Sequence, residues 1–152
     1  MLKTRSCLAL MLIAWPAMAS ASLGGTVSSI ESDRVHVQGA LLHIVTGGSY
    51  TVHELQSASG TVIREFVSPA GTVFGVAWQG PWMPDLRQLL GTYFDQYVNA
   101  VRDVRSRRRG HGPIVIDTAE LVVRVSGRQR AFSGNAYVPS LLPAGFDPQS
   151  VR

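Results

Sequence analysis

The chain has 152 residues, 45% of them hydrophobic, and a formal net charge of +4 from 14 basic and 10 acidic side chains. This length suits one domain whose core needs neither disulfides nor metals to hold it together. With 15 glycines, 8 prolines and one cysteine, the composition excludes a disulfide scaffold and a helical bundle and favours turn-rich β structure.

The amino terminus has the pattern of a secretory signal peptide. Two cations, Lys3 and Arg5, precede an unbroken apolar run over Cys7–Trp15. This run is too short to span a bilayer, which needs about 20 residues. Small residues then fit cleavage after Ala21, which we favour, or after Ala19. We therefore expect a Sec-type signal peptide over residues 1–21 and a periplasmic or secreted protein.

Cleavage leaves residues 22–152 as a single domain without a cysteine. Such a domain has no disulfide, no thiolate metal site and no cysteine nucleophile. Lys3 and Arg5 are two of the 14 basic residues, so the remaining domain has 12 arginines, 10 acids and a net charge of +2. No later stretch is apolar enough to span a bilayer, so no transmembrane segment is expected after signal cleavage.

The segment from Tyr50 to Trp78 is predicted to be an antiparallel meander. Residues 58–62 (ASGTV) are echoed 11 positions later by residues 69–73 (PAGTV). Two equal glycine-bearing turns therefore join three strands. These strands are Tyr50–Gln56, Thr61–Val67 and Thr72–Trp78. Shorter strands are expected upstream at Thr26–Ile30, Arg34–Val37 and Leu42–Val45.

Alternation along the third meander strand separates large side chains from small ones. The large set is Phe74, Val76 and Trp78, and the small set is Val73, Gly75 and Ala77. We expect a helix to pack on the small face, because small side chains allow a close approach.

Residues 86–104 are predicted to form a long amphipathic helix. Apolar residues recur at spacings of three and one from Leu86 to Val104, and polar residues fill the opposite side. Asp85 suits the N-cap, with Gln88 three residues later. Glycines and a proline over residues 110–113 end the helical region.

Two further strands are predicted after the helix, over Leu121–Val125 and Ala131–Val138. The tail, residues 139–152, has three prolines and is expected to run extended over the body. The fold class is therefore α+β: a curved antiparallel sheet, one long amphipathic helix packed on it, and two further C-terminal strands.

Five runs of the sequence form a recognisable series: YTVHEL at 50–55, GTV at 60–62, REFVSPAGTVF at 64–74, WQGP at 78–81 and PDLRQLLG at 84–91. They resemble the exported proteobacterial family called domain of unknown function 2844, which implies no activity, cofactor or catalytic residue. The resemblance extends more loosely from Leu23 to Phe146. The hairpin around Gly60 and Gly71 is also similar to strand pairs of the small exported PepSY modules, some of which restrain secreted proteases.

The histidines and acids form no catalytic or metal motif. None of the four histidines, His36, His43, His53 and His111, has the spacing of a zinc site. No Gly-x-Ser-x-Gly elbow occurs. We therefore expect no catalytic residue, no metal and no cofactor. Two alternatives stay open: a periplasmic hydrolase using His53 with Glu54 or Asp85, and a PepSY-like module that restrains a protease.

A run of arginines ends the predicted helix: Arg102, Arg105, Arg107, Arg108 and Arg109. Each cation near the negative end of the helix dipole stabilises the helix by about 0.3 to 1 kcal/mol. A solvated helix end is therefore one interpretation. The other is an anion patch, joined by Arg124, Arg128 and Arg130, that meets an anionic envelope polymer or lipid. Nucleic acid is not an expected partner of an exported protein.

The loop between the meander and the helix combines rigidity with large apolar side chains. Pro81 and Pro84 restrict its backbone, and Trp82 and Met83 lie between them. Such side chains in a loop either dock inward or offer a recognition surface. We expect the contact residues to be Gln79, Trp82, Met83 and Asp85. The sequence thus favours a non-enzymatic exported module that binds or assembles with another envelope protein.

Overall fold

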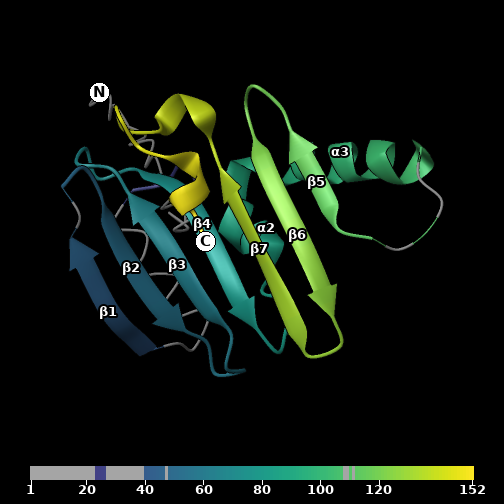
Figure 1. The fold of residues 1–152 in the computed structure, drawn as a ribbon, viewed down its shortest axis with the longest axis horizontal. Coiled ribbons are helices and arrows are strands. Elements are labelled where there is room, and N and C mark those ends of the chain that lie inside the picture. The colour runs from purple at the N-terminus through teal and green to yellow at the C-terminus, as the bar shows by residue number, and fades with distance from the viewer. Residues whose placement is uncertain (1–22, 27–39, 47, 108–109, 111) are drawn as a thin grey trace, which may run out of the picture.

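The computed structural model describes residues 23–26, 40–46, 48–107, 110 and 112–152. They form a seven-stranded antiparallel sheet in the order β1-β2-β3-β4-β7-β6-β5 (Figure 1). Its strands are β1 (Ala40–Thr46), β2 (Thr51–Gln56), β3 (Val62–Val67), β4 (Val73–Gly80), β5 (Ile114–Asp117), β6 (Val122–Arg128) and β7 (Ala131–Tyr137). The α+β class, with an antiparallel sheet and one long helical segment, is confirmed.

The repeated turns of the meander have the same construction. In the β2–β3 turn the hydroxyl of Ser57 accepts from the amide of Thr61 at 3.0 Å, and in the β3–β4 turn Ser68 accepts from Thr72 at 3.2 Å. The glycine of each turn has a positive φ, 86° in the first and 78° in the second, which suits a residue without a Cβ. The 11-residue echo therefore builds one turn twice, as predicted.

Of the three upstream strands, Leu42–Val45 is confirmed as part of β1. Arg34–Val37 lies outside the described residues, as does residue range 27–30 of the first strand. Its first residue, Thr26, forms an isolated antiparallel bridge with Thr72. The predicted signal peptide, residues 1–21, also lies outside the described residues.

The carboxyl-terminal part contributes three strands where two were predicted. The additional strand, β5, has four residues and forms one edge of the sheet. Four residues directly after Pro113 are too few to display a convincing period of two, so the pattern did not reveal it. The last strand, β7, pairs with β4 and with β6, which places it inside the sheet.

A helical segment, interrupted at Gly91 by a φ of 51°, covers one face of the sheet. It consists of α2 (Leu86–Leu90), the 3₁₀ turn η1 (Gly91–Tyr93) and α3 (Phe94–Arg107). Asp85 is the N-cap, as predicted: its carboxylate accepts from the amides of Arg87 at 2.8 Å and Gln88 at 3.3 Å. Leu89, Leu90 and Tyr97 are buried in the core that this segment shares with the sheet. Within the described residues, no helix has the length and apolar character needed to cross a membrane.

The prediction that the helix packs on the small face of β4 is wrong. Val76 and Trp78 belong to the core that the helix covers, whereas a Cβ on Gly75 would lie 3.3 Å from the methyl groups of Val151. The pairing shifts between Phe66 and Val67, so that Phe74 is an extra residue in β4. The bulge puts Phe74 on the face of Gly75 and Ala77 and leaves Val73 with Val76 and Trp78 in the helix-covered core. The helix thus packs on the larger residues, and Gly75 and Ala77 face the carboxyl-terminal segment instead.

The carboxyl-terminal segment, residues 139–152, packs on the second face of the sheet and contains η2 (Pro139–Leu141) and η3 (Pro148–Ser150). The ring centroid of Phe146 lies 4.9 Å from that of Tyr50 and 4.8 Å from that of Phe74, both edge to face. Val151 is fully buried, and the side-chain amide of Asn135 donates to the Val151 carbonyl at 2.7 Å. Figure 1 shows this segment and the helix on opposite sides of the sheet, with the segment over one end of the strands.

Candidate functional site

The histidines do not converge among the described residues. His36 and His111 lie outside that part of the chain, and His43 is exposed on the edge strand β1. His53 is partly buried on β2, and this burial lowers its pKa below the ordinary value of 6.5. In the described ranges, no group of three or more His, Cys, Asp and Glu side chains could hold a metal ion.

The residues of the hydrolase alternative are kept apart. His53 and Glu54 are consecutive on β2, so their side chains point to opposite faces of the sheet. Glu54 accepts a charged hydrogen bond from Nε of Arg64 at 2.7 Å, and Asp85 caps α2. Neither carboxylate is therefore placed to act with His53 in a proton transfer.

Glu65 is a buried acid that is not among the predicted site residues. Its exposed fraction is 0%, and it lies directly opposite His53 in the β2–β3 pairing. Ile63 and Val67 belong to the helix-covered core, so alternation along β3 could have predicted that Glu65 points the same way. Because it is shielded from solvent, we assign Glu65 to the core and not to a contact surface.

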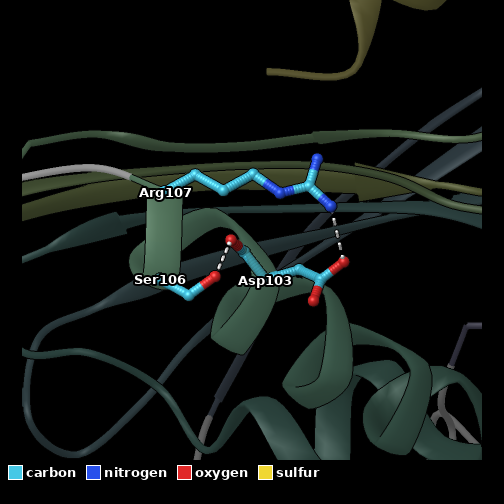
Figure 2. A network of polar contacts seen from close by, with 3 residues as sticks. All are labelled: Asp103, Ser106 and Arg107. Atoms are coloured by element: carbon cyan, nitrogen blue, oxygen red, sulfur yellow. Dashed lines mark hydrogen bonds and ion pairs between the residues drawn. The ribbon is translucent and has the colours of Figure 1, made fainter.

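The arginines at the end of α3 are exposed and are partly neutralised within the helix. A terminal nitrogen of Arg107 lies 3.3 Å from the carboxylate of Asp103, four residues earlier. The hydroxyl of Ser106 donates to the Asp103 carbonyl at 2.8 Å (Figure 2). Arg102 and Arg105 are also exposed, and Arg108 and Arg109 lie outside the described residues.

Arg124 and Arg128 are not continuous with the arginines of α3. The core-facing residues Val123 and Val125 flank Arg124 on β6, so Arg124 points to the face opposite the helix. Arg128 shares that face because it is four residues further along the same strand. Arg130 lies in the β6–β7 turn with a φ of 61°. The extended anion patch is therefore divided between two faces of the sheet.

The predicted loop from Gln79 to Asp85 begins within β4, whose last two residues are Gln79 and Gly80. The connection from Gln79 to Asp85 is held against the first meander turn. The hydroxyl of Thr61, which is buried, donates to the carbonyl of Trp82 at 2.8 Å and accepts from its amide at 3.3 Å. A Cβ on Gly80 would lie only 2.5 Å from the Cα of Thr61, so this close approach requires glycine. The start of the loop is thus fixed by both packing and hydrogen bonds.

The backbone of this loop is fixed, but its large apolar side chains are exposed to solvent. Trp82 is 55% exposed and Met83 is 38% exposed. Gln79 is exposed as well, and the carboxylate of Asp85 is engaged in the helix cap. All four predicted contact residues are thus exposed, and Asp85 in addition has the structural role that the N-cap pattern had already indicated.

A small hollow adjoins the loop. It has a volume of about 320 Å³ and lies between residues 79–81 and the end of the β6–β7 hairpin. Arg130 and Phe132 line it on the hairpin side. The loop and this hairpin end therefore form one continuous surface, with the exposed Trp82 and Met83 following directly after the hollow.

A family model described as "Protein of unknown function (DUF2844)" matches residues 19–151. No curated protein and no solved structure matches the chain.

Proposed function

This chain belongs to the family described as "Protein of unknown function (DUF2844)", and on that premise we propose that it is an exported, non-catalytic binding domain that contacts another protein of the cell envelope. The contact surface is the loop of Gln79, Trp82 and Met83. The observation that carries this proposal is the 55% exposure of Trp82 on a backbone held by Thr61.

A rigid, exposed tryptophan favours binding for two physical reasons. Tryptophan and methionine are enriched at protein contacts, and tryptophan is among the side chains whose truncation costs most. A backbone already fixed by Thr61 and two prolines loses little conformational entropy when a partner covers it. The apolar character of Trp82 and Met83 favours a protein partner, because burial of apolar surface drives most protein association.

The proposed location rests on residues 1–21. Their cationic start, apolar run and small residues before the cleavage frame match a signal that directs export and is then removed. Export supports a partner in the envelope.

Site-specific photo-cross-linking in cells tests the contact surface. p-Benzoylphenylalanine replaces Trp82 in one variant and Ile44 in another. Ile44 is a suitable control because it is 48% exposed, close to the 55% of Trp82, and lies on the edge strand β1. We expect discrete adducts with one envelope protein from position 82 and none from position 44. Equal adducts from both positions, or none from position 82, would contradict the proposal.

A further inference from the structure

The face of the sheet opposite the helix carries a row of polar residues beside the carboxyl-terminal segment. The strand registers align Glu54 of β2 with Arg64 of β3, Arg64 with Ala77 of β4, Ala77 with Asn135 of β7, and Asn135 with Arg124 of β6. A second row aligns Gln79, Ser133 and Ser126 on β4, β7 and β6. Directly paired residues share a face of the sheet. The two rows are two residues apart along β4, β7 and β6, so both rows belong to the same face.

Six residues of these two rows line a groove of about 470 Å³: Arg64, Asn135, Arg124, Gln79, Ser133 and Ser126. Glu54 and Ala77 do not line it. Ligand pockets typically have volumes of about 300 to 1,000 Å³. The groove lies against Pro113 and Val115 at its β5 side. Gln79 lines this groove and also belongs to the proposed protein contact, whereas Trp82 and Met83 do not line the groove. The two surfaces therefore meet at Gln79, but the groove is defined by its arginines and does not depend on Trp82.

The charged side chains that line the groove are all cations. Arg64, Arg124 and Arg152 line it, and none of the described lining residues is acidic. Arg64 uses Nε for its bond to Glu54, and the structure records no ion pair of its terminal nitrogens with a described residue. Arg124 and Arg152 likewise have no ion pair within the described ranges. Guanidinium groups with unused donors are suited to carboxylate and phosphate groups.

Arg152 is held at the groove by the carboxyl-terminal segment. The preceding residue, Val151, is fully buried, and its carbonyl accepts from the side-chain amide of Asn135 at 2.7 Å. These contacts fix the backbone next to Arg152, so one cation of the groove comes from the tail and two from the sheet.

Neutral hydrogen-bonding groups line the groove beside the cations. The hydroxyls of Ser126 and Ser133 are 3.0 Å apart across β6 and β7, and the exposed Gln79 aligns with Ser133. Hydroxyl and amide groups both donate and accept hydrogen bonds, which matches the hydroxyls of a sugar. An isolated inorganic anion would use the arginines and leave these groups to water.

We propose that this groove binds a short acidic sugar chain, with the arginines on its carboxylate or phosphate groups and the serine and amide side chains on its hydroxyls. An open groove suits a chain that continues beyond the site on either side. The ligand is defined by its chemistry, an anionic group on a polyhydroxylated ring.

Calorimetric titration of the protein with two anionic probes tests the proposal. Tetragalacturonate carries carboxylates, pentamannose 6-phosphate carries phosphate, and neutral maltotetraose serves as the uncharged comparison. We expect at least one anionic probe to bind, with at least tenfold weaker binding in Arg124→Gln and no measurable binding of maltotetraose. The anionic probe that binds identifies the anion. Arg124 is exposed, so its substitution should leave the melting temperature unchanged.

Arg102→Gln is the matched control, because it removes the same charge from an exposed position on α3. We expect it to bind the probe like the unaltered protein. An equal loss of affinity in both variants would show attraction by net charge alone and would overturn the proposal. So would the absence of binding by both anionic probes. Inorganic phosphate that binds as tightly as the sugar probes would overturn the assignment of the serine and amide groups.

Discussion

The buried hydroxyl of Thr61 contacts the backbone of Trp82 twice, as a donor to its carbonyl at 2.8 Å and as an acceptor from its amide at 3.3 Å. The two residues are 21 positions apart, so this contact joins the first meander turn to the loop before the helix. It fixes the backbone of Trp82, whose side chain is the most exposed of the large apolar side chains in the described residues. A recognition surface is thereby attached to the rigid sheet.

Substitution of Thr61 by valine should weaken this attachment. Valine has nearly the same shape, but it removes the hydroxyl that pairs with the Trp82 carbonyl and amide. We expect Thr61→Val to lower the free energy of unfolding by about 1 to 3 kcal/mol, measured by urea denaturation. Thr61→Ser keeps the hydroxyl and should lose less. A serine variant as unstable as the valine variant would show that the methyl group, and not the hydrogen bonds, secures the loop.

The face of the helical segment that packs on the sheet can be tested at Leu90. Its side chain is completely buried in the main core, so Leu90→Ala should cost about 2 to 5 kcal/mol of unfolding free energy. Asn99→Ala, at an exposed position of α3, should stay within about 0.5 kcal/mol of the parent. Similar shifts in thermal melting for both variants would contradict the packing described here.

Much of this architecture follows from local sequence patterns. The echo of ASGTV and PAGTV predicts two equal turns, and Asp85 with the apolar spacing after it predicts the helix. Both depend on residues close together in the chain, where propensity and periodicity act directly. The prediction that the helix meets the small face of β4 was wrong because the carboxyl-terminal segment, far along the chain, covers Gly75 and Ala77. The bulge at Phe74 was also missed, since it arises from pairing with β3, which a single strand does not reveal.

Stability should depend on pH through His53. Burial lowers its pKa in the folded protein below 6.5, so the unfolded chain binds more protons just below that pH. Stability should therefore decrease as the pH falls through 6.5 towards the folded-state pKa. Unfolding free energies at several pH values between 7.5 and 5 measure this slope.

Replacement of His53 isolates its contribution. His53→Asn should flatten the decrease in stability between pH 6.5 and 5, whereas His43→Asn, at an exposed position of β1, should leave it unchanged. A slope that is identical in the parent and in His53→Asn would contradict the assignment.

Export is tested by the mass of the protein recovered from the periplasm. Cleavage after Ala21 gives a chain that begins at Ser22, and cleavage after Ala19 gives one that begins at Ser20. We expect intact-mass spectrometry to find one of these two species. Full-length chain in the cytosol would contradict export.

The two candidate surfaces differ in how far the sequence could predict them. Trp82 lies between Pro81 and Pro84, so a rigid apolar loop was visible in four consecutive residues. The groove combines Arg64, Arg124 and Arg152, which meet only because β7 inserts between β4 and β6 and because the tail returns to the sheet. Such a site depends on long-range register, and no local pattern encodes it.

In the proposed function, Trp82 contacts a partner and not the core. The measurement is the affinity of Trp82→Ala for the envelope protein identified by cross-linking, together with its unfolding free energy. We predict at least tenfold weaker binding and a stability within about 0.5 kcal/mol of the parent, while Ile44→Ala changes neither. Unchanged binding, combined with a stability loss of about 3 to 5 kcal/mol as for a buried tryptophan, would contradict the claim.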